Sequence, residues 1–108
     1  MALKVNVENI NFGVTGDLLN ISLDVVLIDD TLAEGYQEVH RRSISAKSNF
    51  NNPDIKAVLM QKIKTQALDI VNAYKQKMGA IQTFYPDAQT PQEALSLFKT
   101  DIETALAE

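Results

Sequence analysis

The sequence predicts an α+β fold, in which a three-stranded antiparallel β-meander packs against one long amphipathic helix and a shorter C-terminal helix follows. Apolar and polar residues alternate through the first half of the chain, whereas apolar residues recur every three or four positions in the second half. A length of 108 residues is that of one domain, so we expect a single domain, 1–108, ordered β-β-β-α-α. The predicted segments are the sheet (1–48), the long helix (53–79), a loop (80–90) and the C-terminal helix (91–107).

The first two strands are predicted from alternating patterns over residues 3–7 and 19–27. The stretch Gly-Val-Thr-Gly-Asp at 13–17 supplies residues that favour a turn between them. We expect a hairpin with a five-residue loop and a register that places Val7 opposite Leu23. In this alternation Ile10 and Phe12 fall on the face opposite Val7, together with Val26 and Ile28 of the second strand, so the sheet is expected to be apolar on both faces at its ends.

Residues 36–47 predict the third strand, since they include β-branched and aromatic side chains, but polar residues occur on both faces. A register that pairs His40 with Asp24 also places Arg41 on the core side of the sheet. This conflict favours an edge strand, where charged side chains protect an open edge or contact a partner. The charged residues are Arg41, Arg42 and Lys47.

The long helix is predicted to start with Asn52 as the N-cap and Pro53 as the first helical residue. Its apolar stripe recurs at spacings of three and four, and Gly79 is expected to end it. The second helix begins with the capping-box sequence Thr-Pro-Gln-Glu at 90–93. Its apolar stripe consists of Leu95, Phe98, Ile102 and Leu106.

Catalytic chemistry finds little support in the composition. The chain has no Cys and one His, so thiol nucleophiles and cysteine-based metal sites are excluded. His40 beside Asp24 could serve as a general base, but no nucleophile motif accompanies it, and an exposed cross-strand pair explains it better. We therefore expect no enzyme, no catalytic residue, no cofactor and no metal.

An alternative function is the binding of a divalent cation or a small molecule. Four acidic residues surround the second turn, but their spacing does not match an EF-hand loop. A pocket between helix and sheet near Tyr74, Phe84 and Tyr85 would be the small-molecule version. The acidic residues are Asp29, Asp30, Glu34 and Glu38.

Membrane and nucleic-acid partners are not expected. No apolar run approaches the roughly 20 residues of a membrane span, and no signal peptide is recognisable, so we expect a cytoplasmic protein or one assembled into a particle. The net charge of -4 opposes binding to a polyanion.

The surplus of apolar residues and the distribution of charge predict a non-enzymatic assembly or accessory subunit that acts through protein-protein contacts, as a homo-oligomer or with a protein partner. Residues 49–83 carry five Lys against two Asp, whereas residues 84–108 carry one Lys against five acids. The basic and acidic helices could therefore pair within one chain or between subunits. The expected interaction surface comprises Arg41, Arg42, Lys47, Phe12, Val26, Ile28, Phe84, Tyr85, Phe98 and Ile102.

A short chain without Cys that begins directly in a strand and combines a sheet with a long helix resembles the small structural proteins of bacteriophages and prophages. The resemblance is one of layout and involves no shared motif. It implies a structural or accessory role in an assembled particle.

Overall fold

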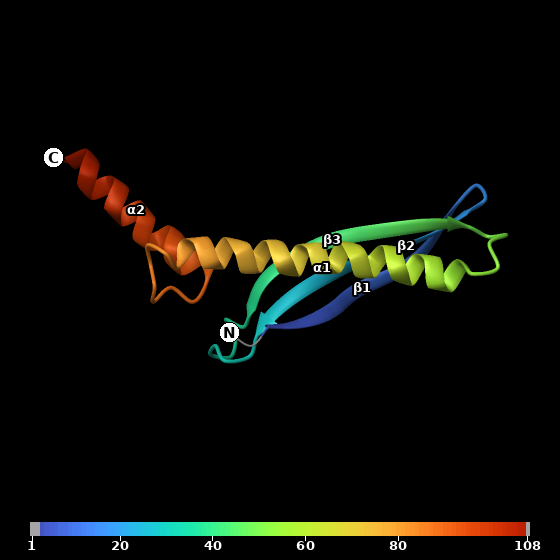
Figure 1. Cartoon of the computed structure of the whole chain (residues 1–108), viewed down its shortest axis with the longest axis horizontal. Helices are drawn as coiled ribbons and strands as arrows, with labels where there is room; N and C mark the ends of the chain where they lie inside the picture. The colour runs from blue at the N-terminus through green and yellow to red at the C-terminus, as the bar shows by residue number, and fades with distance from the viewer. Residues whose placement is uncertain (1–2, 108) are drawn as a thin grey trace. The chain divides into compact units, whose positions relative to one another are not determined.

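The computed structural model describes residues 3–107 and confirms the predicted fold class (Figure 1). An antiparallel meander with the strand order β1-β2-β3 is followed by a long helix, α1, and a shorter one, α2. Residues 1, 2 and 108 of the predicted domain lie outside the described residues. The elements are β1 (Leu3–Thr15), β2 (Leu18–Asp29), β3 (Glu38–Asn49), α1 (Ile55–Ile81) and α2 (Pro91–Ala107).

The chain divides into two compact units, Met1–Asn72 and Ala73–Glu108, and the boundary falls within α1. The first unit holds the sheet and the N-terminal two thirds of α1. The second holds the end of α1, the loop after it, and α2. The expectation of a single domain stays a prediction.

The β1–β2 hairpin is tighter than predicted, because only Gly16 and Asp17 separate the strands. Gly16 adopts a φ of +59°, which a two-residue hairpin turn requires and glycine tolerates without strain. The shorter turn places Val7 opposite Val25, so the predicted pairing with Leu23 is wrong. The error spans two residues and therefore leaves Val7 on the expected face.

The predicted pairing of β2 with β3 is also wrong. Arg41 lies opposite Val26, and His40 lies opposite Leu27 instead of Asp24. An odd shift in register moves every side chain of the strand to the other face. Arg41 therefore lies on the outer face of the sheet, and the conflict raised by its expected position on the core side does not arise.

The core of the first unit lies between the sheet and α1. Odd-numbered residues of β2 face the helix, and those near its middle are buried because the next strand and α1 cover them. The buried apolar residues of this layer are Leu23, Val25 and Leu27 of β2, Ile44 and Ala46 of β3, and Leu59 and Ile70 of α1.

Two hydrogen bonds join α1 to β3. The Lys62 ammonium donates to the carbonyl of Lys47, and the Gln66 amide donates to the carbonyl of Ser45, each at 2.8 Å. The donors are one helical turn apart, and the acceptors are two residues apart along an extended strand, so the two spacings nearly match. These bonds hold α1 on the β3 side of the sheet.

The helix ends differ in how well the sequence predicted them. α1 begins at Ile55 instead of Pro53, after the side chain of Asn52 accepts a hydrogen bond from the amide of Asp54 at 2.9 Å. Gly79 lies inside the helix, which continues to Ile81, so its predicted role as the end is wrong. The predicted bounds of α2 are confirmed.

The capping box of α2 is formed. The amide of Glu93 donates to Oγ1 of Thr90 at 3.2 Å, and the Glu93 carboxylate accepts from the amide of Gln89 at 3.1 Å. Two backbone donors at the start of the helix are thereby satisfied.

We expect Leu27→Ala to lower the free energy of unfolding by about 2–5 kcal/mol, because Leu27 is fully buried and its removal leaves a cavity. Leu68→Ala makes the same chemical change on the exposed surface of α1 and should alter stability by no more than about 0.5 kcal/mol. Urea denaturation followed by circular dichroism measures both. Equal losses for the two variants would contradict this description of the core.

Candidate interaction surface

A β-bulge interrupts β1 at its centre. Pairing is regular up to Glu8 opposite Asp24 and resumes at Asn11 opposite Ser22, so Asn9 and Ile10 together oppose one residue of β2. Asn9 has a φ of 53°, in the left-handed region that asparagine tolerates better than most residues. The extra residue changes which face of the sheet the following side chains occupy.

The bulge gathers the apolar side chains of β1 on one face. Before it, odd-numbered residues such as Val7 face α1; after it, even-numbered residues such as Phe12 and Val14 do so, because they pair with Ile21 and Leu19. The predicted placement of Ile10 and Phe12 on the face opposite Val7 is therefore wrong. The sheet instead has one continuous apolar face.

That face is incompletely covered along β1. Because α1 is bound on the β3 side, five apolar residues of β1 remain 47% to 65% exposed, whereas Leu23, Val25 and Leu27 of β2 and Ile44 and Ala46 of β3 are buried. These exposed residues are Val5, Val7, Ile10, Phe12 and Val14.

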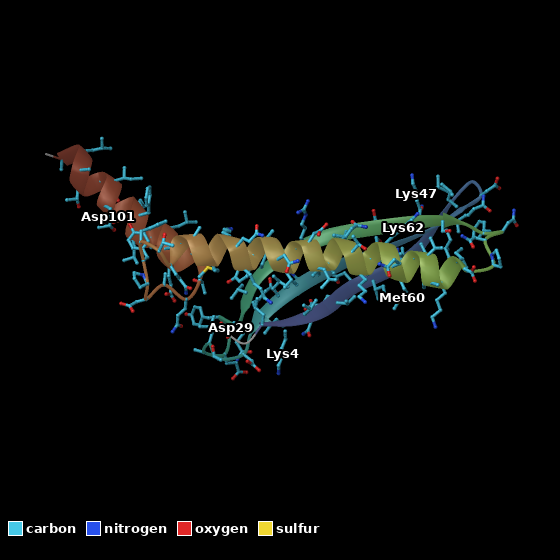
Figure 2. All side chains as sticks on the ribbon, in the orientation of Figure 1. Lys4, Asp29, Lys47, Met60, Lys62 and Asp101 are labelled. Carbon is cyan, nitrogen blue, oxygen red and sulfur yellow. The ribbon has the colours of Figure 1, made fainter. Side chains whose placement is uncertain are left out.

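A groove of about 550 Å³ lies between β1 and α1. Its floor is formed by apolar side chains of β1 and β2, and one wall by the first three turns of α1, including Leu59, Met60 and Ile63. Of the described residues that line it, Lys56 alone is charged. We call this feature the β1 groove. Figure 2 shows Met60 on one side of α1, with Lys62 and Lys47 on the other.

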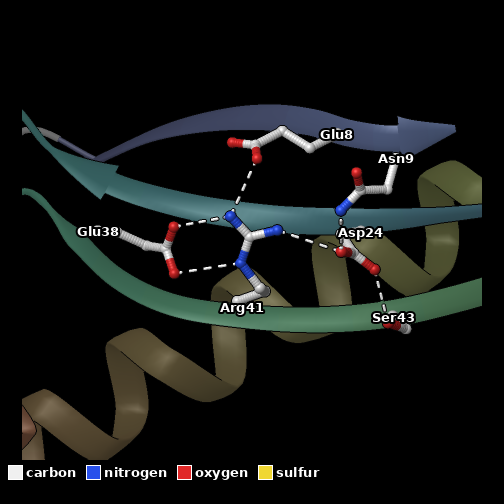
Figure 3. Close-up of polar contacts among 6 residues, drawn as sticks. All are labelled: Glu8, Asn9, Asp24, Glu38, Arg41 and Ser43. Atoms are coloured by element: carbon white, nitrogen blue, oxygen red, sulfur yellow. Dashed lines mark hydrogen bonds and ion pairs between the residues drawn. The ribbon is translucent and has the colours of Figure 1, made fainter.

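The opposite face of the sheet carries a polar cluster centred on Arg41 (Figure 3). Its guanidinium forms ion pairs with Glu8 at 3.0 Å, with Asp24 at 3.1 Å and with Glu38 at 2.8 Å. The hydrogen bonds that Arg41 donates to Glu38 and Glu8 are the main causes that raise the pKa of Arg41, and the same bond to Glu38 lowers the pKa of Glu38. One carboxylate comes from each strand, so the cluster links all three.

Asp24 connects this cluster to the bulge. Its carboxylate accepts hydrogen bonds from the Ser43 hydroxyl at 2.6 Å and from the Asn9 amide at 2.8 Å, besides the contact with Arg41. The Ser43 and Asn9 bonds hold the pKa of Asp24 below its usual range. The left-handed residue of the bulge is thus fixed by a carboxylate on the neighbouring strand.

A second irregularity serves the same cluster. Leu27 pairs with His40 but Ile28 pairs with Glu38, so Val39 is an extra residue in β3. Residues three apart on a regular strand face opposite sides. The extra residue allows Glu38 and Arg41 to share the outer face and pair at 2.8 Å.

The basic residues of the predicted interaction surface do not form one patch. Arg41 is engaged by three carboxylates on the outer face, whereas Arg42 pairs in register with Val25 and belongs to the other face. Lys47 is exposed, and its carbonyl accepts the bond from Lys62.

The apolar residues predicted in the sheet also have different surroundings. Phe12 is 62% exposed in the β1 groove, Val26 is fully buried, and Ile28 is half-buried. Met60 and Lys56, which also line the groove, were not predicted as surface contacts from the sequence. Around Asn9 the apolar residues of β1 change from odd-numbered to even-numbered positions, and this change was the available sequence signal for the bulge in the groove floor.

The remaining predicted residues lie in the second unit. The ring of Phe84 packs edge-on at 5.0 Å from that of Tyr85 and at 6.4 Å from that of Phe98. The Tyr85 hydroxyl donates to Asp101, which raises the pKa of Tyr85. α2 buries Pro91 and Ala94 but leaves its apolar stripe 44% to 81% exposed, namely Leu95, Phe98, Ile102 and Leu106.

The acidic residues around the second turn mostly bond within the protein. Asp30 pairs with Lys4 at 2.8 Å, Asp29 accepts from Thr31, and Glu38 pairs with Arg41. Among residues 3–107, no three His, Cys, Asp or Glu side chains are grouped so that they could hold a metal ion. The charge pairing expected between the two helices stays a prediction.

Neither helix in the described part of the chain is long and apolar enough to cross a lipid bilayer. Comparisons with protein-family models, with curated proteins and with solved structures find no match to this chain.

We expect acid to weaken the sheet through Asp24. Its pKa is lower in the folded state than in the unfolded chain, so its contribution to stability is present above roughly pH 4 and is lost as the pH falls through the folded pKa. Asp24→Asn should be less stable than wild type at neutral pH and lose less stability on acidification. Urea denaturation from neutral to acidic pH measures this. Asp69→Asn is the control, because Asp69 is an exposed carboxylate on α1, and its stability should change with pH as that of the wild type does. The prediction would be contradicted if Asp24→Asn lost as much stability on acidification as the wild type.

Proposed function

We propose that the chain is a non-enzymatic assembly subunit that associates with further copies of itself, and that the β1 groove is the contact surface. The observation that carries this proposal is the uncovered apolar face of β1, a 13-residue edge strand. Large contiguous apolar surfaces on soluble proteins mark interaction sites. The groove in this chain is apolar on its floor and on the α1 wall.

Covering the apolar face of β1 contributes free energy that favours association. Full burial of one large aliphatic side chain contributes about 1.5–3 kcal/mol, so covering a half-exposed one contributes on the order of 1 kcal/mol. The burial of five such side chains on β1, with Met60 beside them, contributes free energy that offsets part of the cost of association.

A second candidate function is the binding of an apolar small molecule in the same groove, since a volume of about 550 Å³ is within the usual range of ligand pockets. Laurate is a suitable probe, because its chain is apolar and its carboxylate could pair with Lys56. A chain that stays monomeric and whose melting temperature rises with laurate would favour this function over assembly.

We expect the mass measured by size-exclusion chromatography with light scattering to rise above that of a monomer between low and high micromolar concentration. Phe12→Asp should weaken association about tenfold or more, because it places a charge in the groove. Tyr36→Asp is the matched control: Tyr36 is also an exposed aromatic, at 76%, but does not line the groove. Circular dichroism checks that both variants fold. A strictly monomeric wild type, or equal effects of the two substitutions, would contradict the proposal.

A further inference from the structure

The β1 groove has the dimensions of a site for a second helix. Helices pack about 10 Å from a sheet and 8–10 Å from one another, so a helix beside α1 would lie over β1. A strand added to the free edge of β1 would extend the sheet but leave the apolar face of Phe12 and Val7 open. A helix covers that face and the α1 wall at Met60 together.

The chain itself contains a helix with a largely exposed apolar stripe. Leu95, Phe98, Ile102 and Leu106 of α2 follow the spacing i, i+3, i+7 and i+11, which is how a helix presents anchors to a groove, and all are substantially exposed. The stripe is about 16 Å long at 1.5 Å per residue. The groove floor from Val7 to Phe12 is about 13 Å long at 3.3 Å per residue, because the bulge leaves it opposite only four steps of β2, from Val25 to Ile21. The part of the stripe from Leu95 to Ile102 is about 10 Å long and fits within it.

The charges are also complementary. α2 carries the acidic residues Glu93, Asp101 and Glu103 and one basic residue, Lys99. Among the described residues, the charged side chain that lines the β1 groove is that of Lys56, which is basic. An acidic helix is therefore favoured in this groove over a basic one.

We propose that α2 of a second copy of the chain occupies the β1 groove, with Leu95, Phe98 and Ile102 against β1 and the first turns of α1. This inference rests on the proposed self-association and specifies the element that mediates it. Each copy then supplies one groove and one helix, so every contact joins two different surfaces. Reciprocal exchange closes a dimer, and one-way exchange builds a ring or a filament.

Single cysteines test the contact directly, since the native chain has none. Met60→Cys, in the groove wall, and Ile102→Cys, in the α2 stripe, are purified separately, and one of them is isotope-labelled. They are then mixed under thiol-disulfide exchange. A disulfide between the two variants necessarily joins two chains, and mass spectrometry separates it from disulfides between identical variants. We expect the mixed species to exceed either identical pair several-fold.

Thr100→Cys is the control partner for Met60→Cys, because Thr100 is exposed on α2 but lies away from the apolar stripe. Its mixed disulfide should form only at the statistical level. Circular dichroism and light scattering confirm that each reduced variant folds and associates.

Two results would overturn the inference, and only the first leaves the proposed function intact. One is a statistical yield of the Met60→Cys and Ile102→Cys disulfide in a chain that associates normally. The other is a doubly substituted chain that forms this disulfide within single chains at every concentration, which would identify the chain's own α2 as the occupant. A wild type that stays monomeric in light scattering would overturn both proposals.

Discussion

The hydrogen-bonded cluster around Asp24 and Arg41 is the constraint on which the rest of the sheet depends. It joins one carboxylate from each strand to a single guanidinium, and it also holds Asn9 in the bulge of β1. The Glu8 and Glu38 carboxylates are exposed, so their ion pairs add little to stability, whereas Asp24 is half-buried and accepts several hydrogen bonds. Their effect is geometric, because each extra residue in β1 and β3 decides which side chains face α1 and which face solvent. The continuous apolar face is a consequence of this arrangement.

The two edges of the sheet are unequal for a second reason. Lys62 and Gln66 of α1 donate to carbonyls of β3, which brings the helix over β2 and β3 and away from β1. One helix is too narrow to cover all three strands, so the position of α1 determines which strand stays exposed. The groove thus arises from a polar contact at one edge and an uncovered apolar surface at the other.

The sequence predicted the fold class and the bounds of α2, because alternation, helical spacing and the Thr90 capping box are local signals. It did not predict the strand registers. The hairpin register depends on a two-residue turn at Gly16, but the sequence also has a glycine at position 13 and does not indicate which of the two forms the turn. The β3 register depends on the extra residue Val39, which the sequence pattern does not reveal because polar residues occur on both faces of that strand. Phe12 was recognised as a surface residue but was placed on the wrong face. Met60 and Lys56 were missed because their exposure depends on where α1 lies, which periodicity does not encode.

The bulge at Asn9 has a further consequence for solubility. A long, flat, apolar edge strand is a template on which identical strands add without limit, and proteins suppress such aggregation by bending or interrupting the exposed edge. Asn9 and Ile10 interrupt the ladder of β1 near its midpoint, so a second β1 cannot pair along its full length in regular register. The same irregularity that gathers the apolar side chains into a docking surface therefore discourages open-ended sheet growth and leaves side-chain packing as the favoured route to contact.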